Sequence, residues 1–331
     1  QGYRATESHA GAGLILRVIV PIPPRHLSEP QLLQVTQAVL DGASGFTQHT
    51  VGRSDGTGTI DAGTLQLRAD TTLRAGSGDL RLNGAVDGAF DLALNSAGNT
   101  RIAGPVGGST ALRSLATDAA GDTTLSGNVR TTGSQTWADP LQADGPLSLS
   151  GSVITAEQAT NRFDGALTVR ADSLQLRSAS ALTLADVTLA NGGRIETDGV
   201  LTLSGAMALN GGTLTLVSNA TPTAVDFSDP ELQGRNLSFG LSPVKEASAT
   251  IVQTDGATLA SAAGSLLVLR SPEGGTLQLN QAGNTLLGDI SAVSGPLGDN
   301  SSTRFVGDEI VLGFVRITSS EIHVAGAPPA A

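Results

Sequence analysis

Four aspartates, Asp118, Asp122, Asp139 and Asp144, are the residues of this sequence best suited to carboxylate chemistry. Cleavage of a glycosidic bond needs two carboxyl groups roughly 5–10 Å apart on one face. Most of these aspartates lie beside Gly or Pro, where Asp is a common turn residue. The chain has one Trp and one Tyr, so the aromatic lining of a sugar cleft is nearly absent. We therefore assign the aspartates to turns and predict no catalytic residue.

Metal and cofactor sites are not predicted either. The histidines are far apart and show no metal-ligand spacing; they are His9, His26, His49 and His323. Calcium bound by Asp and Asn in tight turns is the best inorganic alternative, although the Gly-Gly-x-Gly-x-Asp repeat is missing. The sequence contains no Gly-x-Ser-x-Gly elbow, phosphate-binding loop or dinucleotide motif. We expect no cofactor and no resident metal.

Charge and composition argue against nucleic acids and membranes as partners. The net charge is −11 and Lys245 is the single lysine, so no basic patch is available for a nucleic acid. The chain has no Cys, which excludes disulfides. The apolar run 14–20 is interrupted by Arg17 and is far shorter than the roughly 18 residues of a membrane span. We expect neither nucleic-acid binding nor membrane insertion.

Short apolar-x-apolar triplets separated by Gly, Asn, Asp and Ser recur from about residue 57 onward. Two residues of each triplet point inward and the middle one, usually polar, points outward, as in a minimal strand. The clearest run comprises Leu167-Thr168-Val169, Leu174-Gln175-Leu176, Leu182-Thr183-Leu184, Val187-Thr188-Leu189, Leu201-Thr202-Leu203, Met207-Ala208-Leu209 and Leu214-Thr215-Leu216.

These triplets predict an all-β parallel β-helix, or β-solenoid. We call one circuit of the chain a coil and expect three triplets in each coil of roughly 20–25 residues. Residues 57–325 would then form on the order of 12 coils, stacked about 4.8 Å apart. Trp137 and Phe163 are assigned to the core. The irregular stretches 222–230 and 242–246 are expected to protrude as loops.

The N-terminal segment lacks the triplets. Residues 1–12 are expected to be flexible, residues 13–20 to form a strand, and residues 28–41 to form a helix with Ser28 as its N-cap. We interpret this strand and helix as a cap over the open end of the solenoid; docking on a neighbouring subunit is the alternative. The predicted organisation is an N-terminal arm, strand and helix at 1–47, a β-helix at 48–326 and a tail at 327–331. Residues 310–324 are read as the last coil.

Several segments resemble repeats of very long bacterial exoproteins of the filamentous haemagglutinin type. They are Gly45-Phe46, the run from Val51 to Ile60, and residues 106–112, 115–121, 131–137 and 163–169. The resemblance implies a right-handed parallel β-helix, export through an outer-membrane partner, and a role in adhesion, biofilm or surface fibres. The Asn-Pro-Asn-Leu type motif of the family's secretion domain is absent from this chain.

The function expected from the sequence is that of a secreted, bacterial cell-surface solenoid with a structural or adhesive role and no catalytic activity. The expected partners are further copies of the chain, joined end to end through the N-terminal segment or the open solenoid ends, and host or cell-surface receptors or polysaccharide. The alternative is a carbohydrate-active β-helix enzyme, either a polysaccharide lyase or a hydrolase.

Overall fold

A computed structural model describes residues 4–10, 13–19, 32–221, 249–254, 256–262, 264–271, 276–278, 285–286, 289–294, 303–304, 309–312 and 315–318. Side chains are described for 32–221, 251–254, 256–262 and 264–271. The chain is all-β with almost no helix, and its parallel sheets stack as a β-solenoid of about eight turns. Contacts divide it into unit 1, Gln1–Ser178, and unit 2, Ala179–Ala331.

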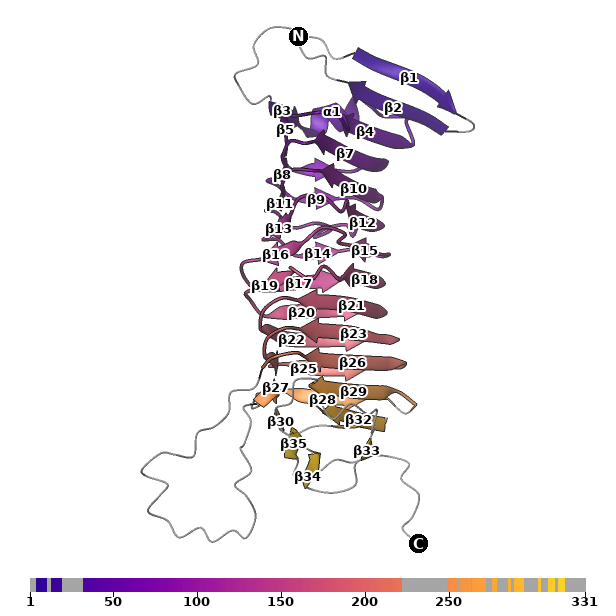
Figure 1. Cartoon of the computed structure of the whole chain (residues 1–331). Helices are drawn as coiled ribbons and strands as arrows, with labels where there is room; N and C mark the ends of the chain where they lie inside the picture. Colours follow the sequence, from indigo (N-terminus) through magenta and orange to yellow (C-terminus); the bar gives the residue numbers. More distant parts are fainter. Residues whose placement is uncertain are drawn as a thin grey trace, which may run out of the picture. The chain divides into compact units, whose positions relative to one another are not determined.

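The strands of unit 1 follow three faces of the solenoid (Figure 1). Sheet A contains β1 (Arg4–Ala10), β2 (Gly13–Ile19), β4 (Gln48–Gly52), β7 (Asp70–Gly76), β10 (Asp91–Ser96), β12 (Ser114–Thr117), β15 (Gln135–Thr136), β18 (Val153–Ala156) and β21 (Ser173–Ser178). Sheet B contains β3 (Leu32–Val35), β5 (Thr59–Ala62), β8 (Leu80–Leu82), β11 (Thr100–Ile102), β13 (Thr123–Leu125), β16 (Leu141–Ala143) and β19 (Arg162–Phe163). Sheet C contains β6 (Leu65–Gln66), β9 (Val86–Asp87), β14 (Val129–Arg130), β17 (Leu147–Ser150) and β20 (Leu167–Ala171).

The strand register gives the length of one coil. Ile60 of β5 lies beside Leu80 of β8, and Leu80 lies beside Thr100 of β11. One coil therefore takes about 20 residues, which confirms the expected repeat length. The expected number of coils was wrong, because the solenoid has about eight turns. Part of the excess comes from the C-terminal region, where antiparallel strands interrupt the parallel repeat.

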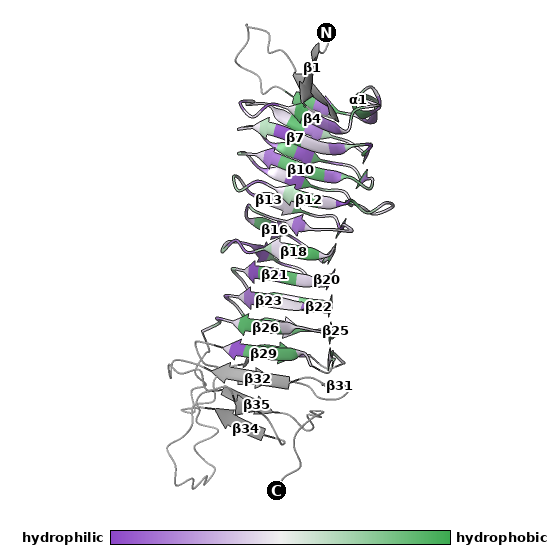
Figure 2. Ribbon diagram, turned by 90° about the vertical axis from the view of Figure 1, so that its right-hand side faces the viewer, coloured by the Kyte–Doolittle hydropathy of each residue, from purple (hydrophilic) through white to green (hydrophobic). Residues whose placement is uncertain are grey.

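The alternation of side chains fills the interior with Leu, Ile, Val and Ala. Along β7, Thr71, Leu73 and Ala75 are buried, and the residues between them are partly exposed. Figure 2 shows the same alternation of apolar and polar residues along β7 and β10. Trp137 and Phe163 are buried, as expected. Stacking brings the inward apolar side chains of successive coils together, which a single coil could not provide.

Glycines lie just before and just after the strands of sheet B, at the corners of the coil, because the backbones of successive coils approach closely there. A Cβ built on Gly78 would lie 2.0 Å from the carbonyl oxygen of Gly58 in the coil before. A Cβ on Gly104 would lie 2.4 Å from the oxygen of Gly84. Real Cβ atoms do not come so near to a backbone oxygen, so these positions require a residue without a side chain.

The predicted helix at 28–41 is largely wrong. Leu32–Val35 forms β3, which pairs in parallel with β5, and only Gln37–Asp41 forms a helix, α1. Leu32 and Gln34 are exposed while Val35 is buried, which is the period of a strand rather than of a helix. Pairing with β5 decides the conformation over local propensity. Ser28, the expected N-cap, lies outside the described residues.

The strand expected at 13–20 is confirmed as β2, whereas the expectation of flexibility for residues 1–12 was wrong over β1. β1 pairs antiparallel with β2, and β2 pairs in parallel with β4. Leu40 of α1 is buried. The side chain of Gln37 forms two hydrogen bonds to the backbone of Gln66 at the edge of β6. Its Oε1 accepts from the Gln66 amide at 2.7 Å, and its Nε2 donates to the Gln66 carbonyl at 3.2 Å. This amide takes the place of a neighbouring strand.

The described strands of unit 2 are β22 (Leu182–Leu189), β23 (Gly192–Thr197), β24 (Leu201–Leu203), β25 (Ala206–Leu209), β26 (Thr213–Ser218), β27 (Ala249–Gln253), β28 (Thr258–Ser261), β29 (Leu266–Ser271), β30 (Thr276–Gln278), β31 (Thr285–Leu286), β32 (Asp289–Ser294), β33 (Thr303–Arg304), β34 (Glu309–Leu312) and β35 (Val315–Thr318). Within unit 2 the described strands pair in parallel, except that β33 pairs antiparallel with β32 and β34 pairs antiparallel with β35.

Two features of unit 2 depart from a regular repeat. Leu201 of β24 pairs with Ile251 of β27, so about 30 residues more than usual separate these neighbouring coils. The loops expected at 222–230 and 242–246 fall in this interval and lie outside the described residues. β34 pairs antiparallel with β35, so the expectation of a simple last coil at 310–324 was wrong. The division predicted at 1–47, 48–326 and 327–331 stays a prediction.

Candidate functional site

The aspartates singled out in the sequence occupy different environments. Asp122 and Asp144 are exposed, and Asp118 is partly buried and accepts the backbone amide of Ser96 at 3.1 Å. Asp139 is buried. Among the described residues no group of three or more His, Cys, Asp or Glu side chains is placed to hold a metal ion. The carboxyl groups are thus distributed over corners rather than gathered in a groove of the described chain.

Of the four histidines, only His49 has a described side chain. It is buried in β4, and its Nε2 lies 3.2 Å from the carbonyl oxygen of Ala43. His9 lies in β1, whose side chains are outside the description, and His26 and His323 lie outside the described residues. The one histidine whose side chain is described lies in the strand next to β2 and is buried.

Asp139 is a buried carboxyl group among the described residues of unit 1. Its side chain accepts hydrogen bonds from the hydroxyls of Thr117 and Thr123, each at 2.5 Å. The Thr117 hydroxyl also accepts the amide of Ala138 at 3.1 Å. Burial raises the pKa of Asp139 above its ordinary value, and the two hydroxyl bonds oppose that rise. The carboxyl group joins three neighbouring segments from inside a corner, where only 1% of the residue is accessible to solvent.

Replacing Asp139 by Asn is expected to flatten the dependence of stability on pH. Because folding raises the pKa of this carboxyl, its contribution to the free energy of unfolding is full below the pKa of the unfolded chain. That contribution falls as the pH rises through the higher pKa of the folded state. The amide cannot ionise, so D139N should lose this decline. Urea unfolding from pH 4 to pH 8 measures it.

The matched control for D139N is Asp144→Asn, which removes an exposed carboxyl one coil corner away. D144N should retain the wild-type slope of stability against pH over the same range. If D139N retained that slope as well, the buried carboxyl would not be the source of the pH dependence.

Other Asp and Asn side chains bind the backbone of the next coil. Asp79 accepts the amide of Asn99 at 3.1 Å, and Asn128 accepts the amide of Ser148 at 2.9 Å. In unit 2, Asp186 accepts the amide of Ala206 at 2.9 Å. In each pair the acceptor and donor are 20 residues apart. We call these contacts the corner bonds; they satisfy amides that no strand pairing reaches.

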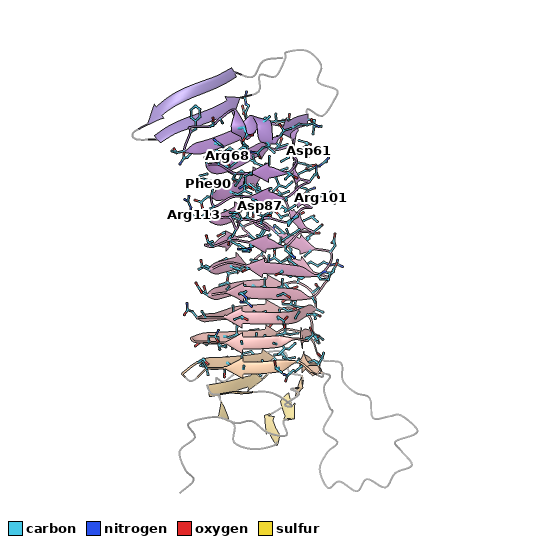
Figure 3. All side chains as sticks on the ribbon, turned by 180° about the vertical axis from the view of Figure 1, so that it is seen from behind. Asp61, Arg68, Asp87, Phe90, Arg101 and Arg113 are labelled. Atoms are coloured by element: carbon cyan, nitrogen blue, oxygen red, sulfur yellow. The ribbon has the colours of Figure 1, made fainter. Side chains whose placement is uncertain are left out.

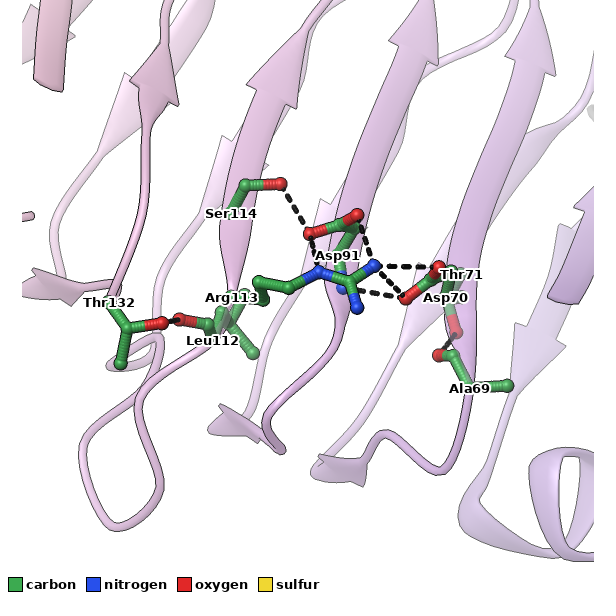
Figure 4. A network of polar contacts seen from close by, with 8 residues as sticks. All are labelled: Ala69, Asp70, Thr71, Asp91, Leu112, Arg113, Ser114 and Thr132. Carbon is green, nitrogen blue, oxygen red and sulfur yellow. Dashed lines mark hydrogen bonds and ion pairs between the residues drawn. The ribbon is translucent and has the colours of Figure 1, made fainter. Parts of the chain in front are cut away.

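Among the ion pairs of the described side chains in unit 1, Arg113 forms a cluster with two carboxylates (Figure 4). Its guanidinium contacts Asp91 at 2.5 Å and Asp70 at 2.8 Å, so it links three successive coils. Ser114 donates to Asp91 at 2.7 Å. These bonds, that from Arg113 above all, lower the pKa of Asp91. In Figure 3, Arg113 lies on the opposite side of unit 1 from Asp61 and Arg101.

Replacing Arg113 by Gln is expected to raise the pKa of Asp91 toward its ordinary value. Asp91 then loses its main cationic hydrogen bond while Asp70 remains one coil away. The lowered pKa gives a stabilisation that is present above the pKa of the unfolded chain and is lost as the pH falls through the lower pKa of the folded chain. The free energy of unfolding of R113Q should therefore depend less on pH in the acid range. Carboxyl NMR titration measures the shift. Arg81→Gln, which removes the partner of Asp79, should leave the pKa of Asp91 unchanged.

A small hollow lies at the corner between sheets A and B near the N-terminal end of unit 1. Its apolar lining comes from Leu32, Leu33 and Ile60, and its polar lining includes Arg53 and Arg74. Arg53 is bound to Asp55 by two hydrogen bonds of 2.7 and 2.5 Å. The Nε of Arg74 is buried and has no hydrogen-bond partner. Sequence reasoning missed this hollow because residues 32–35 were assigned to a helix.

These features define a β-helical repeat protein of the solenoid class. Comparisons with family models, with curated proteins and with solved structures find no match to this chain. Within the described residues, no helix has the length and apolar character needed to cross a membrane.

Proposed function

We propose that this chain is a structural or adhesive part of a secreted bacterial surface protein, in which the solenoid acts as a stiff spacer without catalytic activity. The observation that carries the proposal is the use of polar side chains as bonds between coils. Corner bonds recur 20 residues apart in both units, and Arg113 links three coils. These polar side chains bond one coil to another.

Stiffness follows from this arrangement. Each coil bonds to the coil before it and the coil after it through strand pairing and corner bonds. An interior coil cannot open unless it loses partners on both sides. Proteases cleave chains that open locally, so a stack of this kind resists digestion. Length, stiffness and protease resistance are the properties that a surface spacer or fibre needs.

The resemblance to filamentous haemagglutinin-type exoproteins supports the same function. It covers about residues 45–220, which include most of the described parallel coils. Proteins of that type act in adhesion, biofilm and surface fibres, and we propose the same setting and a bacterial cell-surface location for this chain. A right-handed coil is part of that proposal.

The alternative of a carbohydrate-active enzyme has one observation in its favour, the raised pKa of Asp139, since general acids of glycosidases have raised values. A general acid must come within hydrogen-bond reach of its substrate. Asp139 is instead enclosed by Thr117 and Thr123 inside the corner, with 1% of its surface accessible. Its environment therefore supports a structural carboxyl.

Electron microscopy combined with a cleavage assay tests the proposed function. The purified chain should appear as rods or fibres, should survive trypsin in its coil region, and should release no reducing ends or unsaturated uronates from neutral and acidic polysaccharides. Cleavage that persists in D144N and disappears in D139N would overturn the structural function in favour of the enzyme. Globular particles that trypsin degrades throughout would reject the spacer.

A further inference from the structure

Two arginines of sheet C differ from most arginines of unit 1. Arg53 and Arg162, for example, each pair with an aspartate two residues further along the chain. Arg130 of β14 and Arg170 of β20 are exposed, and their side chains form no ion pair with any residue that the structure describes. Their guanidinium groups are therefore free to bind an anion from outside the chain.

The strand register places the two arginines in one column on the outer face of sheet C. Arg130 lies beside Ser150 of β17, and Ser150 lies beside Arg170. Figure 1 shows β14, β17 and β20 on successive coils of this face. The Cα atoms of Arg130 and Arg170 are thus two coil steps apart, about 9.6 Å. We call Arg130, Ser150 and Arg170 the arginine column. Gly107, the neighbour of Arg130 in the coil before, has no side chain that could pair with it.

A second column of small polar residues runs beside the arginine column. It consists of Asn128, Ser148 and Thr168, each two residues earlier in the chain and so on the same outer face. Ser148 lies in register with Thr168, and Asn128 accepts the amide of Ser148 at 2.9 Å. Neither column contains a carboxylate or an aromatic side chain. The face therefore offers two cations beside neutral hydrogen-bonding groups.

We propose that the arginine column binds an acidic polysaccharide, an extended polyuronate that lies across β14, β17 and β20. Guanidinium groups bind carboxylates through paired N–H donors. Successive sugars of an extended polyuronate face opposite sides, so the carboxylates of alternate sugars lie along one side of the chain. Arg130 and Arg170 each bind one of these carboxylates, and Ser150 lies opposite the sugar between them. The neutral column donates and accepts hydrogen bonds to the sugar hydroxyls.

The composition of this face favours a polyuronate over other polymers. Binding of single-stranded nucleic acid uses a positively charged groove and aromatic side chains that stack on the bases, whereas this face has no aromatic residue and the chain carries a net charge of −11. A neutral polysaccharide has no carboxylate for the two arginines. The proposal rests on the adhesive form of the proposed function and names the chemical class of its ligand.

Binding of alginate oligomers, measured by isothermal titration calorimetry at low salt, tests the proposal. Arg130→Gln and Arg170→Gln should each weaken binding at least about threefold, and the double variant about tenfold, because each exposed ion pair contributes modestly. Ser150→Asp should weaken binding as much as the double variant, although it keeps both arginines. The new carboxylate would lie between Arg130 and Arg170 and would compete with the ligand for both guanidinium groups.

Arg101→Gln is the matched control, because Arg101 is exposed on sheet B, forms no ion pair among the described residues and loses the same charge. R101Q should bind like the wild type, and circular dichroism should show every variant folded. Equal weakening by R101Q and R130Q, or equal affinity of the wild type for dextran or single-stranded DNA, would overturn the arginine column as a polyuronate site. Trypsin-resistant rods that bind no alginate would also overturn it, yet they would leave the proposed spacer function intact.

Discussion

Replacing Trp137 by Ala is expected to lower the free energy of unfolding by about 3–5 kcal/mol, the usual cost of emptying a large buried aromatic site. Trp137 is 1% exposed and follows β15 at a corner of unit 1. Its backbone amide bonds to the carbonyl of Thr155 at 2.9 Å in the next coil, so the cavity would open between stacked coils. Chemical denaturation followed by circular dichroism measures the loss.

Trp137→Phe separates lost volume from lost polarity. The indole Nε1 of Trp137 is buried without a hydrogen-bond partner, so Phe removes an unsatisfied donor while it keeps most of the apolar surface. We expect W137F to retain most of the stability that W137A loses. Thr136→Ala, at the exposed neighbouring position, should change stability little. Equal losses in W137A and T136A would contradict the assignment of the indole to the core.

Replacing Gly78 by Ala is expected to destabilise unit 1 by about 1–3 kcal/mol through overpacking. The added Cβ would lie 2.0 Å from the carbonyl oxygen and 2.5 Å from the carbonyl carbon of Gly58. Both atoms belong to backbone, so the coils would have to separate locally, and the neighbouring bonds between coils would lengthen. Thermal unfolding and amide exchange over β5 and β8 measure the effect.

Gly63→Ala is the control for this steric argument. A Cβ on Gly63 meets no atom within 4 Å, although Gly63 also lies at a corner of sheet B. G63A should therefore unfold like the wild type or slightly above it, since Ala restricts the unfolded chain. A similar loss in both variants would point to glycine flexibility, and not to close approach of the coils, as the reason for Gly78.

The solenoid could be predicted from the sequence because its signal is repeated. A triplet such as Leu80-Arg81-Leu82 is buried at both ends and exposed in the middle, and the same pattern recurs in each neighbouring coil. The number of coils was overestimated because the triplets do not show which strands reverse direction. β34 and β35 contain good triplets, yet they pair antiparallel with one another.

The N-terminal end shows where a local pattern misleads. Leu32, Val35, Val39 and Leu40 have helical spacing, but Leu32–Val35 extends along β5 because a paired edge there satisfies more backbone groups than a short helix would. The hollow at Leu32 depends on that strand, so it could not be predicted either. The buried position of Asp139 was equally hidden, because a turn aspartate and a corner aspartate have the same neighbours in sequence.

The bonds between coils also determine how unit 1 would respond to mechanical load. Because neighbouring coils are held by many parallel contacts but belong to one continuous chain, tension on the chain end would peel the outermost coil before the next one bears force. A coil of about 20 residues would release about 70 Å of extended chain. In a single-molecule pulling experiment the coils would unfold one after another in small, regular steps, and each step would absorb mechanical work before the chain is fully extended.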